Sequence, residues 1–234
     1  SPAMQRLWTL IQNTANTKAN ILITGETGVG KSAVAKAIHA ISNRANGPFI
    51  EVNCAVLHEN LIESELFGYE KGAFTGAASG GKIGKIELAN HGTLFLDEIG
   101  ELPPHIQSKL LQLIQEKTIE RLSSNRRIEL DFRLIVATNR NLEEEVQRGL
   151  FRSDLFYRLN VIRVHIPPLR QRPDDILPLA HQFLERFCRE YGKQITFSPR
   201  FISFLEQFSW PGNVRQLENL MERLVITSQD PILD

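Results

Sequence analysis

The feature that most constrains this chain is the glycine-rich segment at residues 25–32, which reads GETGVGKS. It fits the pattern G-x-x-x-x-G-K-[ST], in which backbone N–H groups surround phosphate oxygens. The preceding residues 20–24 (NILIT) predict a short buried strand, and apolar residues recur at helical spacing from residue 33 onward. A strand, a glycine turn and a helix start direct the helix dipole at a phosphate. An accidental match would rarely have both flanks, so the segment predicts nucleotide binding.

The side chains of this segment have distinct expected roles toward a nucleotide. Lys31 would place a positive charge at the β- and γ-phosphates, and Ser32 would offer a hydroxyl ligand for Mg²⁺. Most other contacts to the phosphate oxygens would come from backbone N–H groups of the loop. We expect the nucleotide-binding residues of the loop to be Gly25, Glu26, Thr27, Gly28, Val29, Gly30, Lys31 and Ser32.

A pair of acidic residues follows a second buried segment. Residues 92–96 (GTLFL) form a continuous apolar run, as a central parallel strand would, and the run ends in Asp97 and Glu98. Open α/β sheets bind ligands at the carboxyl ends of their strands. Asp97 can hold Mg²⁺ through water, and Glu98 can polarise an attacking water. Acidic strand ends are often merely solvated, but together with the loop this pair favours hydrolysis over phosphoryl transfer to a small molecule.

Three further polar residues have two interpretations each. Asn139 ends the apolar run at 132–138, where its amide either senses a γ-phosphate or simply begins a turn. Arg152 and Arg158 flank a short segment of helical character. Each arginine either forms a surface ion pair or acts as an arginine finger that stabilises the transition state. A finger supplied by a neighbouring subunit would make hydrolysis depend on assembly.

The order of the expected elements indicates the fold class. Strand-like runs alternate with helical patterns along most of the chain, and only helical periodicity follows Pro173. This order predicts an α/β fold with a parallel sheet flanked by helices, followed by a small, all-helical lid. We place the α/β core at residues 1–170 and the lid at residues 171–234.

Several local patterns predict individual elements. Apolar residues at helical spacing predict the buried faces of three helices: Met4, Leu7, Trp8 and Ile11; Ile106, Leu110, Leu113 and Ile114; and Phe201, Phe204, Leu205 and Phe208. Residues 118–130 predict a hairpin. Gly192 predicts the end of a helix, and Ser198 followed by Pro199 predicts the cap and first turn of the next one.

Composition excludes several classes of function. The chain has 27 Lys and Arg against 27 Asp and Glu, so bulk electrostatic binding of nucleic acid is not expected. No apolar run approaches the length of a membrane span. Its 2 cysteines are far apart and have no metal-ligand neighbours, which is typical of buried or inert thiols in a reducing compartment. We expect a cytoplasmic protein that does not contact the membrane.

The glycine-rich segment at residues 68–84 contains the most specific motif. A linker there should be polar, but this one carries apolar residues, and residues 72–77 read GAFTGA. Other motifs are ELFGYEK at 65–71, GTLFLDE at 92–98, RLNV at 158–161 and WPGNVR at 210–215. With these motifs, essentially the whole chain resembles the central AAA+ domain of bacterial sigma-54-dependent transcriptional activators, the enhancer-binding proteins.

The resemblance implies a function and a set of partners. It implies an AAA+ P-loop ATPase that uses ATP and Mg²⁺, and that forms a homo-oligomeric ring, a hexamer or a heptamer. The ring would remodel the sigma-54 RNA polymerase holoenzyme to activate transcription. DNA would be bound only through a domain absent from this chain, which resembles an excised central domain without its regulatory and DNA-binding neighbours.

The resemblance also implies roles for particular residues. Asn53 would restrain Glu98, Asn139 would lie in the first sensor, and Arg215 would be the second sensor. Arg152 and Arg158 match the two candidate fingers that act across subunits. The implied sigma-54 contact is made by Gly72, Ala73, Phe74, Thr75, Gly76 and Ala77.

One departure and two alternatives bear on this interpretation. Ser32 stands where the family usually has Glu, which moves the loop toward the general phosphate-binding pattern and keeps Mg²⁺ ligation plausible. A family member that responds to nucleotide without remodelling should have a broken GAFTGA motif, and this motif is intact. Another P-loop enzyme, such as a small-molecule kinase, would lack both GAFTGA and the paired Asp97 and Glu98.

Overall fold

The computed structural model describes residues 1–57, 59–73 and 80–233 of the chain. These residues form two compact units, which we call the α/β unit and the helical unit. The α/β unit comprises residues 10–24 and 32–164, and the helical unit comprises residues 1–9, 25–31 and 165–234. The phosphate loop therefore groups with the helical unit. The division between residues 170 and 171 that the sequence suggests stays a prediction.

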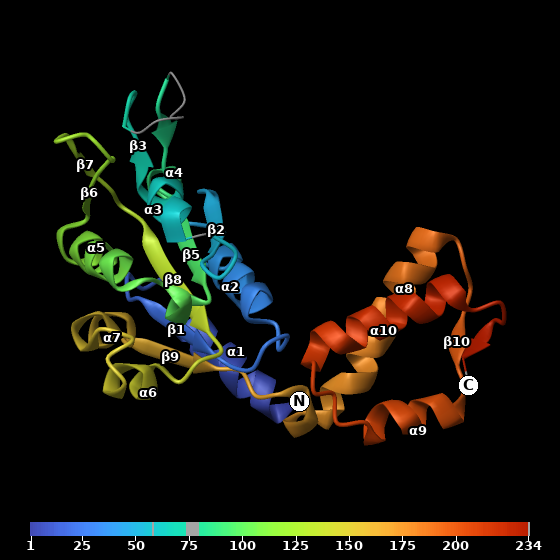
Figure 1. Cartoon of the computed structure of the whole chain (residues 1–234). Helices are drawn as coiled ribbons and strands as arrows, with labels where there is room; N and C mark the ends of the chain where they lie inside the picture. Colours follow the sequence, from blue (N-terminus) through green and yellow to red (C-terminus); the bar gives the residue numbers. More distant parts are fainter. Residues whose placement is uncertain (58, 74–79, 234) are drawn as a thin grey trace. The chain divides into compact units, whose positions relative to one another are not determined.

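The α/β unit is built on a five-stranded sheet with the strand order β2-β5-β8-β1-β9 (Figure 1). The strands are β1 (Ile21–Thr24), β2 (Phe49–Asn53), β5 (Thr93–Asp97), β8 (Arg133–Thr138) and β9 (Ile162–His165). The pairs β2–β5, β5–β8 and β8–β1 are parallel. Every residue of β1 and β8 is buried, because helices cover both faces of a parallel sheet, and this explains their nearly continuous apolar sequences. The predicted parallel sheet is confirmed.

Helices cover this sheet on both sides. They are α2 (Lys31–Ala40), α3 (Glu59–Phe67), α4 (Lys85–Leu88), α5 (Pro104–Glu116), α6 (Leu142–Gln147) and α7 (Ser153–Leu159), with a 3₁₀ turn η1 (Ile99–Glu101) after β5. Figure 1 shows α2 on one side of the sheet and α5 and α7 on the other. The apolar face predicted for α5 is buried in the core at Ile106, Leu110, Leu113 and Ile114.

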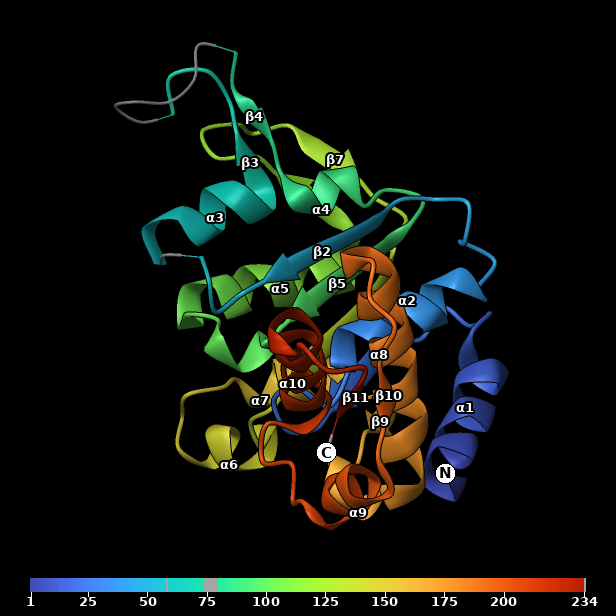
Figure 2. The same ribbon diagram turned by 90° about the vertical axis from the view of Figure 1, so that its right-hand side faces the viewer.

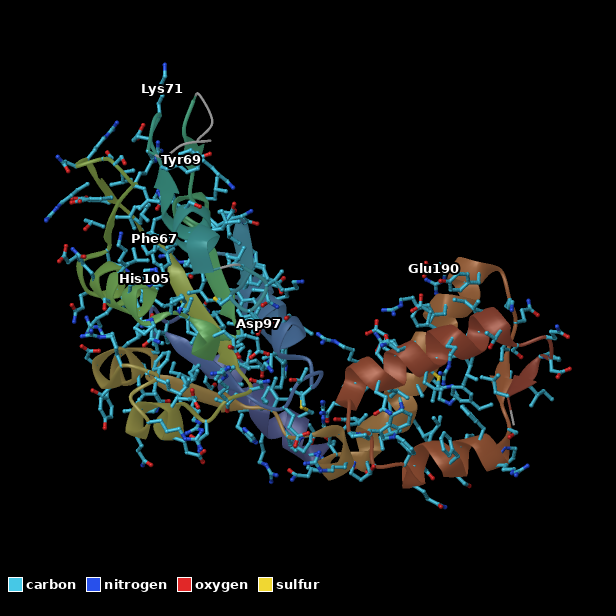
Figure 3. The ribbon with its side chains drawn as sticks, in the orientation of Figure 1. Phe67, Tyr69, Lys71, Asp97, His105 and Glu190 are labelled. Carbon is cyan, nitrogen blue, oxygen red and sulfur yellow. The ribbon has the colours of Figure 1, made fainter. Side chains whose placement is uncertain are left out.

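The two ends of the glycine-rich segment form a stem of two short strands. β3 (Gly68–Tyr69) pairs antiparallel with β4 (Lys82–Ile83), so the described ends of this segment are not a linker. Gly68 has φ 76°, and a Cβ there would lie 2.4 Å from the carbonyl oxygen of Lys82, so this position requires glycine. In Figure 3 the side chains of Phe67, Tyr69 and Lys71 follow one another along the stem, and Lys71 points outward. Residues 74–79, which include most of GAFTGA, lie outside the described residues.

A second hairpin lies beside this stem in both Figure 1 and Figure 2. It consists of β6 (Thr118–Glu120) and β7 (Arg127–Glu129), as the sequence predicts. The N–H of Leu122 donates to Gly68 O at 3.0 Å, and the N–H of Glu70 donates to Leu122 O at 3.1 Å. Arg121 adds ion pairs to Glu70 and Glu87. Backbone and side-chain bonds therefore join the stem and the hairpin.

The helical unit contains α8 (Ile176–Tyr191), α9 (Pro199–Gln207) and α10 (Asn213–Thr227), preceded by the 3₁₀ turns η2 (Leu169–Gln171) and η3 (Pro173–Asp175). The predicted cap is confirmed, since Ser198 Oγ accepts from the N–H of Phe201 at 3.1 Å. Gly192, with φ 65°, ends α8 as predicted. The unit also contains a short parallel strand pair, β10 (Thr196–Phe197) and β11 (Ile232–Leu233), visible in Figure 2. Two-residue strands have no periodicity, so the sequence does not reveal them.

Two residues expected on apolar helix faces are instead exposed. Helix α1 (Pro2–Thr14) buries Leu7 and Ile11, whereas Trp8 is 40% exposed because each residue turns the helix by about 100°. In α9, Phe204 is 45% exposed, although Phe201 and Leu205 are buried. The predicted helices are present, but the width predicted for their apolar faces was wrong.

Candidate functional site

The phosphate loop has the backbone that its glycines permit. Gly28 and Gly30 have φ values of 78° and 105°, a region that residues with a Cβ rarely adopt. A Cβ on Gly28 would lie 2.5 Å from the carbonyl oxygen of Gly212, so the loop and the start of α10 approach too closely for any side chain there. Lys31 is buried, and its Nζ donates to the carbonyl oxygens of Gly25 at 3.1 Å and Glu26 at 3.3 Å.

Glu26 is the loop residue whose side chain has the clearest partners. Its carboxylate accepts two hydrogen bonds from the guanidinium of Arg170, at 2.8 and 2.6 Å, and one from Asn213 Nδ2 at 3.1 Å. The bond from Arg170, followed by that from Asn213, lowers the pKa of Glu26 to about 2. The predicted loop residue thus contacts two other residues of the helical unit, and sequence reasoning missed both of these partners. Asn213 lies within the WPGNVR motif, which was the available signal.

Arg215, the predicted second sensor, lies on the first turn of α10. Its backbone N–H donates to the carbonyl oxygen of Gly28 at 3.2 Å, so it is adjacent to the phosphate loop. Its side chain lines a cavity of about 610 Å³, together with Thr27, Gln216 and the aromatic residues Phe204 and Trp210. Phe204 also lines this cavity, and it is therefore exposed there even though Phe201 and Leu205 of the same helix are buried.

The acidic pair and two of the predicted asparagines meet at one edge of the sheet. Asp97 is the last residue of β5 (labelled in Figure 3), and in the parallel register it pairs with Asn53 of β2. Asp97 Oδ1 accepts from the N–H of Glu98 at 3.0 Å, and Glu98 Oε2 accepts from the N–H of Asn139 at 3.2 Å. Glu98 has φ 53°, an uncommon conformation for a residue with a side chain and one found often at functional sites.

The structure gives Asn53 a local bond. Its Oδ1 accepts from the N–H of Ala55 at 2.9 Å. The restraint of Glu98 by Asn53 therefore stays a prediction, and the Asn139 N–H is a partner of the Glu98 carboxylate that the sequence did not suggest. The neighbouring Cys54 is buried, and burial with the charges of Asp97 and Glu98 raises the pKa of its thiol to about 12. Cys54 is thus an inert thiol, as expected.

The two predicted arginines lie at opposite ends of α7, in the α/β unit. Arg152 precedes the helix and pairs with Asp154 at 2.7 Å, a bond that raises the pKa of the guanidinium. Its backbone N–H donates to Oε1 of Gln107 at 2.9 Å, and sequence reasoning missed this buried glutamine. Arg158 is exposed, and its side chain makes no hydrogen bond or ion pair with the residues that the structure describes. Arg152 therefore forms a surface ion pair within the chain, and a finger role for either arginine stays a prediction.

The oxygen donors of the α/β unit fit Mg²⁺ chemically. Ser32 offers a hydroxyl and Asp97 a carboxylate, and Mg²⁺ prefers such hard oxygen ligands alongside phosphate oxygens and water. Among the described residues, no group of three or more His, Cys, Asp or Glu side chains is arranged to hold a metal ion. An ion bound by Ser32 and Asp97 would take its remaining ligands from phosphate oxygens and water.

Comparison with known families identifies the chain. Residues 1–165 match the family described as the sigma-54 interaction domain, and residues 170–234 match the AAA+ ATPase lid domain. The chain belongs to the sigma-54 interaction domain family. The resemblance inferred from the sequence motifs is therefore confirmed. In the part of this sigma-54 interaction domain that the structure describes, none of the helices combines the length and apolar character needed to cross a membrane.

Curated relatives support the same assignment and are longer than this chain. It is 49% identical over 233 residues to the Nif-specific regulatory protein of Azospirillum brasilense, covering 100% of this chain and 37% of that protein. It is 51% identical over 234 residues to the regulatory protein AtoC of Escherichia coli (strain K12), covering 100% of this chain and 50% of that protein. This sigma-54 interaction domain thus spans half or less of these two relatives.

Solved structures give the same fold. NtrX from Brucella abortus is 40% identical, with a TM-score of 0.92 over 99% of this chain and 52% of that chain. The same NtrX was solved in complex with ADP and with ATP, with TM-scores of 0.91 and 0.90. The predicted AAA+ fold class, a parallel sheet with a helical lid, is confirmed.

Proposed function

We propose that this sigma-54 interaction domain binds ATP with Mg²⁺ and hydrolyses it as a ring of identical subunits in the cytoplasm. The ring would use this cycle to remodel the sigma-54 RNA polymerase holoenzyme and activate transcription. The observation that carries the proposal is Glu98, whose carboxylate is bonded to the Asn139 N–H beside Asp97, in a chain with an intact phosphate loop.

Each side chain would have a defined role in hydrolysis. Glu98 would accept a hydrogen bond from the attacking water and increase its nucleophilicity, with one carboxylate oxygen kept in place by Asn139. Lys31 would stabilise the charge of the transferred phosphoryl group. Ser32 and Asp97 would hold Mg²⁺, which when bound neutralises charge on the phosphates.

A neighbouring subunit would complete the site. Arg158 is exposed on α7, and its side chain has no ion pair with the described residues that a finger role would have to break. Arg152 would first have to leave Asp154, and this favours Arg158 as the finger. A positive charge added across a subunit boundary stabilises the transition state by about 10³–10⁵-fold in rate. ATP hydrolysis should therefore rise with protein concentration in step with the measured mass of the assembly.

The contact with sigma-54 would be made by the GAFTGA segment. Its stem consists of β3 and β4 and is bonded to the β6–β7 hairpin, so paired backbone supports the base of the segment. Gly72 and Ala73 follow β3, and the N–H of Ala73 donates to Glu70 O at 3.2 Å. Phe74, Thr75, Gly76 and Ala77 would be the contact residues, as the family resemblance implies.

Replacing the proposed base tests this function. We expect Glu98→Ala to bind ATP with near-wild-type affinity and to hydrolyse it at least 100-fold more slowly, because loss of a general base typically removes about 10²–10⁴-fold in rate. Glu116→Ala, at an exposed acid on α5, is the matched control and should keep normal turnover. Wild-type turnover by Glu98→Ala would remove Glu98 from the mechanism. A chain that hydrolyses ATP as an assembly but does not bind purified sigma-54 would contradict the remodelling step.

A further inference from the structure

The backbone carbonyl groups of the phosphate loop are held in place by specific donors. Each carbonyl from residue 25 to residue 29 accepts a hydrogen bond, either from Lys31 of the loop itself or from a residue of the lid. The acceptor and donor pairs are Gly25 and Glu26 with Lys31 Nζ, Thr27 with Asn213 Nδ2, Gly28 with the N–H of Arg215, and Val29 with Arg172 Nη2. The donors for the last three carbonyls all come from the lid.

The direction of a carbonyl fixes the direction of the next N–H. In a trans peptide unit the C=O and the following N–H point to opposite sides of the chain, and the structure has no cis peptide bonds in its described residues. A bond that holds the Thr27 carbonyl toward the lid therefore turns the Gly28 N–H the other way. Phosphate-binding loops need several N–H groups that converge on the anion. Lid donors thus determine whether the loop presents its N–H groups together.

Asn213 is the best placed of these donors. It is 0% exposed, and its Oδ1 accepts from the N–H of Leu169 at 2.8 Å. Because a backbone N–H can only donate, this bond fixes the amide orientation and leaves Nδ2 as the donor. Nδ2 then donates to the Thr27 carbonyl at 3.1 Å and to Glu26 Oε2 at 3.1 Å. One side chain therefore joins the start of α10, the start of η2 and the phosphate loop.

We propose that Asn213 is a positioning residue that holds the phosphate loop in the form that receives phosphate groups. It acts through the Thr27 carbonyl and the Glu26 carboxylate rather than by touching the nucleotide. By sharing the Glu26 carboxylate with Arg170, it also keeps that negative charge on the lid side of the loop. The inference rests on the proposed nucleotide binding. Its consequence is that movement of the lid changes phosphate affinity directly.

The backbone at Asn213 allows a clean test. Its φ of 54° is readily adopted by Asn, Asp and Gly but is strained for Ala. Asn213→Gly therefore removes the amide without adding backbone strain. We expect this variant to bind a fluorescent ADP analogue about tenfold more weakly, since apparent affinity falls with the fraction of molecules in the receptive form. Unchanged affinity would overturn the proposal.

A matched control is available in the α/β unit. Asn141 caps α6, with Oδ1 accepting from the N–H of Glu143 at 3.2 Å, and it has no bond to the loop among the described residues. Asn141→Gly deletes the same amide group and should leave ADP affinity unchanged. Thermal unfolding of each variant establishes that binding is measured on folded protein. If Asn141→Gly weakens binding as much as Asn213→Gly, the effect is not specific to the loop and the proposal fails.

A charge exchange tests the mechanism even if Asn213→Gly does not fold. Asn213→Asp keeps an acceptor for the Leu169 N–H but places a second carboxylate beside Glu26, so it should weaken ADP binding more than Asn213→Gly. Adding Glu26→Gln to this variant removes the repulsion between the carboxylates at positions 213 and 26, and the new glutamine amide can donate a hydrogen bond to the aspartate. The double variant should bind the ADP analogue more tightly than Asn213→Asp alone. If the loss of affinity in the double variant equals the product of the losses in Asn213→Asp and Glu26→Gln, Asn213 does not act through Glu26.

Failure of the two proposals can be told apart. If the wild-type chain does not bind the ADP analogue, the proposed function and the role of Asn213 both fail. If the wild-type chain binds it, Lys31→Ala weakens the binding, and Asn213→Gly binds like wild type, only the positioning role is overturned.

Discussion

Gln107 anchors the helix that carries the candidate arginine fingers. This side chain on α5 is 0% exposed. Its Nε2 donates to the carbonyl oxygens of Leu102 at 2.8 Å and Leu150 at 3.0 Å, and its Oε1 accepts from the N–H of Arg152 at 2.9 Å. Gln107→Leu has nearly the same volume but leaves these three backbone groups without their partner.

The expected loss of stability follows from these bonds. Leaving a buried polar group unsatisfied costs about 1–3 kcal/mol. Only the bond to Leu102 is fully buried, so water can replace part of the other two. The leucine side chain would return about 1 kcal/mol through apolar burial. We therefore expect the free energy of unfolding of the α/β unit to fall by about 2–4 kcal/mol.

The assay must report on the correct unit. The 2 tryptophans of the chain, Trp8 and Trp210, both belong to the helical unit, so tryptophan fluorescence follows the unfolding of that unit. Urea unfolding should therefore be followed by far-ultraviolet circular dichroism as well, and the change that fluorescence does not share is assigned to the α/β unit. Gln112→Leu, at an exposed position on the same helix, is the control and should change stability by less than about 0.5 kcal/mol.

The same variant should also affect turnover. Because α7 begins directly after Arg152, we expect ATPase activity to fall about tenfold, since a displacement of about 1 Å at a catalytic group can cost about 100-fold. Affinity for ADP should be unchanged. A Gln107→Leu variant with wild-type stability and wild-type turnover would refute the claim that this amide holds α7.

Two further predictions follow from the lid and from α7. The pKa of Glu26 is about 2 when folded against a usual 4.5, so its stabilising effect is complete above pH 4.5 and is lost as the pH falls toward 2. Urea unfolding of the helical unit, followed by tryptophan fluorescence, should show a smaller loss of stability across this window in Glu26→Gln than in wild type, and equal losses would contradict the assignment. Mixing Arg158→Ala with Lys31→Ala subunits should restore part of the ATPase activity, since each supplies what the other lacks. Absence of activity at every mixing ratio, with assembly verified by mass, would argue against a finger that acts across subunits.

Local features of the fold were readable from the sequence because their causes are local. A strand buried on both faces must be apolar along its length, so the run at 132–138 predicted β8. Ser198 followed by Pro199 predicted the start of α9, and Gly192 predicted the end of α8. The phosphate loop was also local, because its function depends on backbone conformations that only glycine adopts readily. These patterns, with GAFTGA, were sufficient to identify the family.

Tertiary structure alone decided which side chains meet. Asn213 contacts Glu26 across 187 positions of sequence, Asn139 contacts Glu98 across 41, and Gln107 contacts Arg152 across 45. Each of these contacts is one or two hydrogen bonds between single residues, and such bonds leave no periodic pattern in a sequence. The motifs therefore determined that the chain has a phosphate loop and an acidic strand end. Folding determined that lid residues donate hydrogen bonds to the carbonyl groups of the phosphate loop, because only the packed chain brings these donors and acceptors within hydrogen-bonding distance.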